Sequence, residues 1–445
     1  MLNLIQGTFV HTPALNKLEI LEDYLLGIWD PFGTIKHFAP SNSPESVALL
    51  ERYTPRIIPR GNFILPTFCD LHLHAPQFLY QGNGLHLPLM QWLNEYAFKA
   101  EERMDNDAKL AQKVYTRLAQ RLKENGTGAV MLFGTIKEET NLILAKCMND
   151  AGLRAFVGKL SMDQLSSPDY IEESAKASIE AAKSFAFKMQ CKYPALPDTV
   201  EPVITPRFVP TCSDALLDGL GRYATACGLR IQSHLAESHD QVSAVLTERG
   251  VDDIEVFARS SLLTPKTVQA HCTFLDGPSL GRLQATGTAV AHCPLSNAYF
   301  SAEPFKLREA LDMSVKVGLG TDVAGGYSLS IMDAMRQAVA VSRMRQGANV
   351  MNKSSETSLA IDWVEALYLA TKGGADALGI ESGVFEIGRA FDAQQIALWD
   401  QSGGIGPLDF FDEGARISPD IVEKWWCLGD ARNRLGMWIQ GKERI

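Results

Sequence analysis

The sequence predicts an α/β protein built around a TIM-type (β/α)8 barrel. The first observation is that short β-rich runs alternate with helix-like stretches from about residue 62 to residue 325. The second is that eight such runs can be counted along this stretch. The third is that histidines and an aspartate stand at the ends of several runs, where barrel enzymes carry their chemistry. Eight alternating βα units in about 260 residues fit a closed barrel better than an open sheet.

Each predicted strand is an apolar or β-branched run bounded by turn residues. The runs are 63–74, 129–136, 155–162, 203–209, 229–234, 268–272, 289–292 and 315–320. The stretches between them have helical spacing. Over 110–122, for example, Leu or Val recurs at every fourth residue, which is typical of an amphipathic helix.

The two ends of the chain differ from the barrel region. Residues 1–60 hold short β-like pieces broken by turn residues, and 384–400 reads as a turn followed by a strand. We therefore expect 1–60 and 384–445 to form one small β-sandwich-like domain with a C-terminal segment. The catalytic barrel would then occupy 61–383, with its last part, from about residue 327, mostly helical.

The composition excludes several classes of protein. Of the 445 residues, 46% are hydrophobic and 21% are charged, as in an ordinary globular protein. The formal net charge of -10 and the absence of a Lys/Arg cluster argue against a nucleic-acid partner. No apolar run of about 18 residues indicates a membrane span, and the first residues lack a signal-peptide pattern. The eight cysteines show no CxxC spacing and read as reduced thiols, so we expect a cytoplasmic location.

Histidines gather at the ends of the predicted strands. His72 and His74 end the first run, and the period of 2 puts both imidazoles on one face of a strand. His234 ends the fifth run, His271 lies at the end of the sixth, and Asp322 follows the eighth in a glycine-rich turn. Each alone has an ordinary explanation, such as a core histidine or a turn aspartate. Together, at successive strand ends, they predict a divalent-metal site that can activate water for hydrolysis.

One carboxylate follows this pattern closely. Glu237 lies three residues after His234, so it can stand beside a metal-bound water without being a ligand. The alternative is a carboxylate at a helix start, where the helix dipole favours negative charge. We predict that Glu237 is the acid/base group.

Five segments resemble the metal-dependent deaminase branch of the amidohydrolase superfamily, and the resemblance covers nearly the whole chain. These segments are 66–77, 205–208, 232–237, 292–297 and 320–328. The resemblance implies one Zn²⁺ per chain, with Fe²⁺ as the alternative, held by His72, His74, His234 and Asp322. His271 would orient the metal-bound water, and the sequence leaves open whether it also touches the metal.

The same resemblance implies hydrolytic deamination of a purine base, with guanine as the expected substrate. A zinc-bound hydroxide would attack C2 of the base, and Asp322 would take the proton of the water. Glu237 would protonate the neighbouring ring nitrogen and then the leaving amine, while His271 would stabilise the oxygen. Xanthine and ammonia would be the products.

Several residues are implied as substrate contacts. Arg207 presents a planar set of donors suited to carbonyl oxygens and ring nitrogens, although a strand-end ion pair would also explain it. Gln77 offers one donor and one acceptor, and Phe208 can stack on a flat base. A site built on such hydrogen bonds should reject adenine. The full implied set is His74, Ala75, Pro76, Gln77, Arg207, Phe208, His234, Glu237 and Asp322.

Three other residues are expected to have lesser roles. Lys159 falls on the third predicted strand, whereas binuclear members of the superfamily use a lysine at the end of the fourth, so a single metal is favoured. The apolar loop 81–92 is expected to cover the site, with His86 as a lid or packing residue. His292, at the end of the seventh run, is expected to be structural.

Two alternatives stay open at this point. A related aminohydrolase would act on another purine, a nucleoside or a triazine. A barrel that has lost catalysis would serve as a scaffold, although such a protein would usually lack the metal ligands. The resemblance also implies a homodimer that takes a small-molecule substrate.

Overall fold

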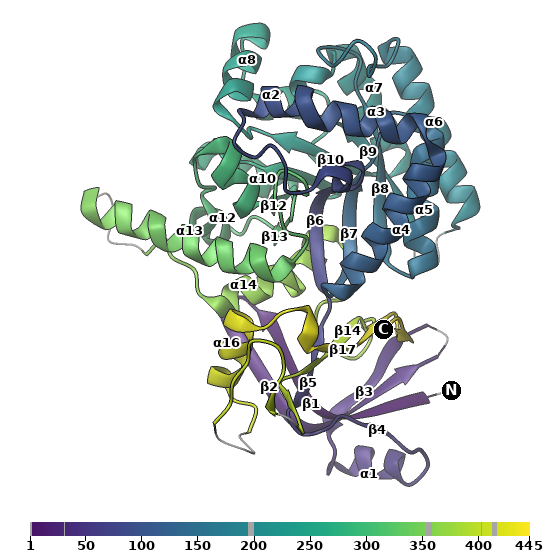
Figure 1. Cartoon of the computed structure of the whole chain (residues 1–445), viewed down its shortest axis with the longest axis vertical. Helices are drawn as coiled ribbons and strands as arrows, with labels where there is room; N and C mark the ends of the chain where they lie inside the picture. Colours follow the sequence, from purple (N-terminus) through teal and green to yellow (C-terminus); the bar gives the residue numbers. More distant parts are fainter. Residues whose placement is uncertain (1, 31, 195–199, 353–357, 402, 412–415) are drawn as a thin grey trace.

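Eight parallel strands form a barrel in the computed structural model, which describes residues 2–30, 32–194, 200–352, 358–401, 403–411 and 416–445 (Figure 1). The strands follow one another in chain order. They are β6 (Phe68–His74), β7 (Thr127–Phe133), β8 (Arg154–Ser161), β9 (Val200–Pro206), β10 (Arg230–Leu235), β11 (Thr267–His271), β12 (Ala289–His292) and β13 (Val317–Leu319). The first and last strands lie in contact, and just beyond β13 the Asp322 amide donates to the His72 carbonyl at 2.8 Å. The predicted (β/α)8 barrel is confirmed.

Helices surround the barrel strands (Figure 1). The expected helix over 110–122 lies within α4 (Ala108–Glu124). This helix begins after Asp107, and the Asp107 side chain accepts hydrogen bonds from the amides of Lys109 and Leu110. The helices after β7 to β13 are α5 (Glu138–Ala151), α6 (Ala175–Lys192), η3 (Val209–Thr211), α7 (Asp214–Cys227), α8 (His239–Arg249), α9 (Asp253–Arg259), α10 (Gly277–Thr286), α11 (Pro294–Ser296), η4 (Asn297–Ser301), α12 (Leu307–Asp312), α13 (Ile331–Asn352), α14 (Trp363–Ala370) and α15 (Lys372–Leu378). None of the helices among the described residues is long and apolar enough to cross a membrane.

A long segment with several helices separates β6 from β7. It consists of η1 (Ala75–Tyr80), α2 (Leu89–Trp92), η2 (Leu93–Ala97), α3 (Phe98–Asn106) and α4 (Ala108–Glu124). Figure 1 shows α2 and α3 lying across the end of the barrel toward which β6 runs. The carboxyl ends of the barrel strands therefore lie beneath a helical cover.

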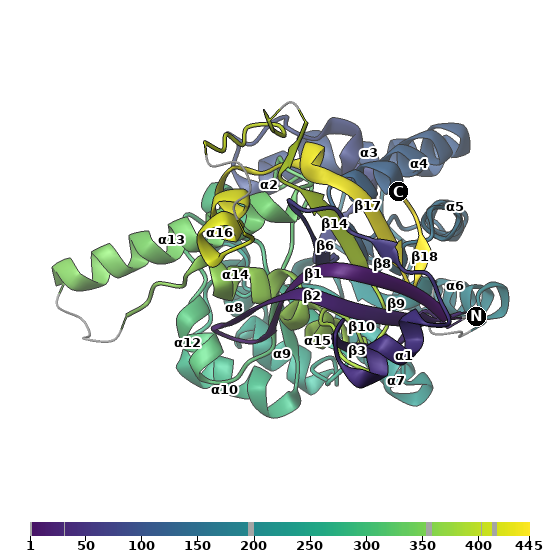
Figure 2. The same ribbon diagram turned by 90° about the horizontal axis from the view of Figure 1, so that it is seen from below.

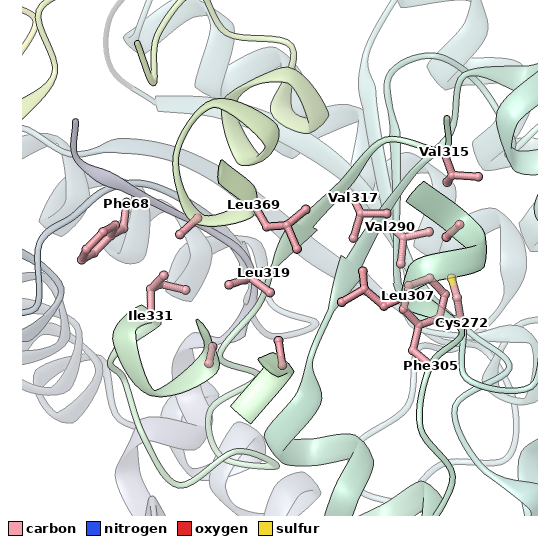
Figure 3. Packing of buried hydrophobic residues seen from close by; sticks show 14 of the residues in the cluster. Phe68, Cys272, Val290, Phe305, Leu307, Val315, Val317, Leu319, Ile331 and Leu369 are labelled. Atoms are coloured by element: carbon pink, nitrogen blue, oxygen red, sulfur yellow. The ribbon is translucent and has the colours of Figure 1, made fainter. Parts of the chain in front are cut away.

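Buried apolar side chains of the outer helices pack against those of the barrel strands. In Figure 3, Leu319 of β13 lies near Leu369 of α14 and Ile331 of α13, and both helices contact this strand. All three side chains are buried, and fully burying such a side chain contributes about 1.5–3 kcal/mol. This packing holds the strand ends, and the side chains that follow them, in fixed positions.

The two chain ends build a second sheet beside the barrel. Figure 2 shows it from below, with strands from the start and the end of the chain side by side. Its strands are β1 (Leu2–Ala14), β2 (Lys17–Trp29), β3 (Thr34–Pro40), β4 (Arg56–Ile57), β5 (Asn62–Pro66), β14 (Ala393–Ala397), β17 (Arg434–Ile439) and β18 (Lys442–Glu443). The other elements of the two ends are α1 (Pro44–Leu50), the ribbon β15 (Trp399–Asp400) and β16 (Gly403–Gly404), α16 (Pro419–Leu428) and η5 (Ala431–Asn433). A sheet built from both chain ends agrees with the predicted fold class.

The predicted strand 63–74 is wrong as a single strand. It divides at Thr67: β5 pairs antiparallel with β14 in the end sheet, and β6 begins the barrel. Every residue of both strands is buried, so the apolar run shows no break in the sequence. The end sheet thus takes residues 62–66, which the predicted division had placed in the barrel; the division of the chain into two domains is otherwise a prediction.

Candidate active site

Four polar side chains converge at the carboxyl ends of the barrel strands. His72 and His74 come from β6, His234 comes from β10, and Asp322 follows β13. The Nε2 atoms of His74 and His234 lie 2.9 Å apart. Asp322 Oδ1 lies 3.1 Å from His72 Nε2 and 3.6 Å from His74 Nε2. The structure therefore gathers all four predicted metal ligands into one buried cluster.

The imidazoles of this cluster are arranged as ligands rather than as ordinary core histidines. His234 Nδ1 donates to the Arg207 carbonyl at 2.6 Å, so its Nε2 carries a lone pair. Burial holds the pKa of His72, His74 and His234 well below the usual value, so these rings are neutral. His72 Nε2 finds no hydrogen-bond partner among the described residues. Two overlapping groups have ligand atoms within 4.8 Å of one another, namely His72 with His74 and His234, and His72 with His271 and Asp322. Such imidazole and carboxylate donors fit a divalent metal such as Zn²⁺ or Fe²⁺.

His271 lies beside this cluster at the end of β11. Its Nδ1 donates to Asn297 Oδ1 at 2.9 Å, which turns Nε2 toward the site. This Nε2 is 3.8 Å from Asp322 Oδ2 and 3.6 Å from Glu237 Oε1. Burial lowers the pKa of His271, while Asp322 opposes that shift. The ring thus stands between the carboxylates of Asp322 and Glu237.

The backbone bends sharply where these strands end. Ala236, His271 and Asp322 have φ values of 49°, 68° and 49°. This left-handed region is costly for residues with a side chain, about 1–3 kcal/mol each, and tends to persist where function requires it. Gly325 serves the same turn, because a Cβ there would lie 2.8 Å from both Asp322 Oδ2 and Ser296 Oγ.

Asp70 lies behind the cluster and supports it through hydrogen bonds. Its carboxylate accepts from the Thr321 amide at 3.0 Å, from Thr321 Oγ1 at 2.6 Å and from the His72 amide at 3.3 Å. Burial raises the pKa of Asp70 to about 7. These contacts tie β6 to the turn that carries Asp322. The sequence motif contained Asp70, but the pattern of strand ends gave it no role.

Glu237 lies at the pocket and is only 7% exposed. Burial, followed by repulsion from Asp322, raises the pKa of its carboxyl to about 8. A carboxyl group with a pKa near neutrality can both give and take a proton. Its location and its environment both suit the predicted acid/base role.

The turn that carries Glu237 is held by side chains from the following helices. Asp253 Oδ2 accepts from the Ala236 amide at 2.9 Å and from Gln241 Nε2 at 2.7 Å. Gln241 Oε1 accepts from the Glu237 amide at 3.4 Å, and Ser301 Oγ donates to the Glu237 carbonyl. The Glu237 backbone is therefore fixed from three sides.

The predicted substrate contacts reach the same pocket with two exceptions. Gln77, Arg207 and Phe208 line it, whereas the described lining residues do not include Ala75 or Pro76, which are buried in η1. The pocket is lined by His74, Gln77, Leu89, Trp92, Leu93, Arg207, Phe208, His234, Glu237, Ser296, Phe300, Asp322 and Gly325.

A buried carboxylate connects two of these contacts, and sequence reasoning missed it. Glu101 of α3 accepts from Arg207 Nη1 at 2.6 Å and from Gln77 Nε2 at 3.0 Å. Phe98 packs under Arg207, with the guanidinium 5.0 Å from its ring centroid. The predicted ion pair and the predicted substrate contact of Arg207 are thus compatible. Glu101 lies on α3, away from the end of any strand, so no strand-end rule identifies it.

The lesser roles expected from the sequence can also be located. Leu89 and Trp92 of the loop 81–92 line the pocket, whereas His86 is exposed. Lys159 is buried, pairs with Glu172 and donates to the Leu160 carbonyl at 2.7 Å. These contacts are those of a structural lysine.

His292 does not line the pocket formed by the described residues. It is buried, and its ring centroid is 5.3 Å from that of Phe305. Burial lowers its pKa to about 3, so the ring is neutral, as expected for a packing residue.

Comparison with known proteins gives a consistent result. The model of the amidohydrolase family matches residues 63–443. The chain is 38% identical to a guanine deaminase of Mus musculus, over 99% of this chain and 96% of that protein. It is 34% identical to a guanine deaminase of Dictyostelium discoideum, over 100% of this chain and 98% of that protein.

Solved structures share the fold. The crystal structure of a guanine deaminase from C. acetobutylicum with bound guanine in the active site superimposes with a TM-score of 0.89. The two chains are 29% identical, and the match covers 100% of each.

Proposed function

Because the chain belongs to the amidohydrolase family, and its relatives of 38% and 34% identity are guanine deaminases, we propose that it hydrolyses guanine to xanthine and ammonia. The observation that carries this proposal is the buried cluster of three histidines and Asp322, of which all but His72 line one pocket with Glu237, Gln77 and Arg207. The first group suits water activation, and the last two present hydrogen bonds to a polar base.

One divalent metal is proposed, held by His72, His74, His234 and Asp322, with Zn²⁺ favoured and Fe²⁺ as the alternative. When bound, such a metal lowers the pKa of water toward about 7 and so supplies a nucleophile at neutral pH. The orphaned Nε2 of His72 and the 2.9 Å approach of two Nε2 atoms support a cation at this point. The ion pair of Lys159 supports a single metal rather than two.

The proton movements are assigned to the carboxyl groups of the pocket. Asp322 accepts a proton from the attacking water. Glu237 donates its proton to the ring nitrogen beside C2, takes the proton of the hydroxyl group added to that carbon, and passes it to the departing amine, which leaves as ammonia. The proton held by Asp322 then returns to Glu237. His271, fixed by Asn297, hydrogen-bonds the oxygen that is added to C2. Guanine and water are consumed, and xanthine and ammonia are formed, so atoms and protons balance.

The purine is held by the predicted contacts. Arg207 and Gln77 donate to acceptor atoms of the base, and Phe208 packs beside its ring. Leu89 and Trp92 close the pocket from the helical cover and limit access of bulk water.

Related aminohydrolase substrates are the alternative, and an activity panel separates them. Solved structures of an adenosine deaminase and a triazine hydrolase are 21% and 18% identical to this chain, so they show the shared fold alone. Ammonia release should be measured with guanine, adenine, adenosine and a triazine. We expect kcat/KM to be highest for guanine by at least about 10²-fold, because unpaired buried donors penalise the wrong base. Comparable values for guanine and adenine would refute the proposal.

The homodimer and the cytoplasmic location stay predictions. A sizing measurement of the purified protein tests the first of them, with about twice the mass of one 445-residue chain expected.

A further inference from the structure

We propose that Glu101 determines which base the site accepts, by fixing the orientation of the Gln77 amide and of the Arg207 guanidinium. The inference rests on the proposed guanine deaminase activity and deepens it. Glu101 lies behind the pocket-lining residues rather than among them. It is therefore a positioning residue, which acts on substrate through two others.

The carboxylate of Glu101 is fully buried and divides its two oxygens between two partners. Oε2 accepts from Arg207 Nη1 at 2.6 Å, and Oε1 accepts from Gln77 Nε2 at 3.0 Å. Both partners line the pocket that also holds Glu237 and Asp322. One side chain of α3 thus orients both groups that face the polar edge of the base.

Gln77 is held in a single orientation because each end of its amide has a partner of fixed character. The carboxylate of Glu101 can only accept, so it selects the NH₂ end. The Ala324 amide can only donate, and it reaches Gln77 Oε1 at 3.2 Å. If the amide turned over, its oxygen would face a carboxylate and its NH₂ would face an N–H group. Both hydrogen bonds would be lost, and both would be replaced by repulsion.

The locked amide leaves one N–H donor and one oxygen lone pair for the substrate. Arg207 adds further donors, since only Nη1 is engaged by Glu101. This set matches a lactam edge, in which a C=O stands beside a ring N–H, as at C6 and N1 of guanine. An amidine edge, in which a C–NH₂ stands beside a bare ring nitrogen, has the reversed pattern.

The substrate pair that isolates this effect is guanine and 2,6-diaminopurine. Both carry the C2 amine that leaves, and they differ in having the lactam or the amidine edge. Glu101→Gln keeps the size of the side chain but allows its amide, and that of Gln77, to turn. kcat/KM for guanine and kcat/KM for 2,6-diaminopurine should be measured for the wild type and for this variant. KM, kcat, metal content and Tm should be measured as well.

We expect the wild type to prefer guanine by about 10²-fold or more, and Glu101→Gln to reduce that ratio at least about tenfold. The change should lie mainly in KM for guanine, while bound metal stays at the wild-type level. Glu102→Gln, the half-buried neighbour on the same helix, is the matched control and should keep the wild-type ratio. A ratio within about twofold of the wild type in a folded, metal-containing Glu101→Gln protein would overturn the inference.

The wild type alone supplies a second test if the variant does not fold. 2-Aminopurine has the leaving amine but nothing at C6, so it neither satisfies nor opposes Gln77. A locked amide predicts that 2,6-diaminopurine is turned over no better than 2-aminopurine. A freely turning amide would accept the 6-amino group and make 2,6-diaminopurine the better substrate, which would overturn the inference. Failure of the wild type to deaminate guanine would instead refute the proposed function.

Discussion

Two groups of side chains at and behind the pocket, called the metal wall and the recognition wall, are built in different ways. The metal wall consists of His72, His74, His234 and Asp322, and the recognition wall consists of Gln77, Glu101 and Arg207. On the metal wall the donor atoms face one another, and His72 Nε2 lacks a partner among the described residues. On the recognition wall each side chain is hydrogen-bonded to another. The first arrangement calls for a cation, and the second is complete before a substrate arrives.

This difference indicates that one group of residues supports the chemical reaction and another group supports the choice of substrate. Three residues of the metal wall lie on barrel strands, and Asp322 follows a barrel strand. Two members of the recognition wall, Gln77 and Glu101, come from the helical segment between β6 and β7. Variants at or beside the metal wall should lower the activity on every substrate. Variants of the recognition wall should change the ratio of the activities on different substrates.

The largest effect is expected from Glu237→Gln, which removes proton transfer beside the metal wall. kcat should fall about 10²–10⁴-fold for every substrate that the wild type accepts, because general acid/base catalysis typically contributes this much. Metal content, measured by elemental analysis, should stay at the wild-type level because Glu237 is not among the proposed ligands. Retention of most of kcat would show that another group moves the protons.

The next effect is expected from Asp70→Asn, which weakens the brace behind the metal wall. Both carboxylate oxygens of Asp70 accept hydrogen bonds, one from Thr321 Oγ1 and the other from the His72 amide. An asparagine side chain at this position has only one oxygen that can accept. Groups that orient ligands typically contribute about 10–100-fold to metal affinity, so this loss is expected here. Competition with a chromophoric chelator measures it. The guanine to 2,6-diaminopurine ratio should not change, and a changed ratio would break the division between the walls.

A smaller effect is expected from Arg207→Lys on the recognition wall. Lysine keeps the charge beside Glu101 but cannot present a planar set of donors. KM for guanine should rise about tenfold or more, with a smaller change in kcat, in steady-state kinetics. A variant that lost bound metal instead would place Arg207 on the metal-wall side.

The smallest effect on activity is expected from Asp253→Asn, in the support behind Glu237. Burial raises the pKa of Asp253 to about 6, above the 3.8 of an unperturbed aspartate. The folded state therefore keeps this proton while the unfolded state loses it, so the unfolding free energy falls as pH rises from about 4 to about 6. Across that window the loss is at most about 3 kcal/mol.

Asparagine does not titrate, so the unfolding free energy of the variant should lack this decrease between about pH 4 and about pH 6. Urea unfolding at pH 4 and pH 6 compares the two proteins. Equal slopes for the wild type and Asp253→Asn would mean that this carboxyl does not carry the pH dependence.

The two walls also differ in how far the sequence could predict them. The histidines and Asp322 stand at strand ends, and parallel strands in a barrel bring those ends together, so the cluster could be predicted from spacing. Glu101 is one of two adjacent glutamates on α3, and nothing in its neighbourhood in the sequence marks it as buried. Only the contact between α3 and the strand ends reveals it.

The same reason explains the other miss in the fold. β5 and β6 form one apolar run, and β5 is assigned to the end sheet by its pairing with β1 and with β14, the latter more than 300 residues away. Long-range pairing of this kind leaves no local signal, whereas the alternation of strands and helices does.

The most direct test of the account is a metal titration of guanine deamination. The chain should be freed of metal with a chelator, and Zn²⁺ should be added in steps while the loss of guanine absorbance is followed. We expect no activity without metal and a rise that saturates at about one equivalent per chain, as a site with four protein ligands requires. Full activity without metal, or saturation at two equivalents, would contradict the assignment of His72, His74, His234 and Asp322 to a single catalytic ion.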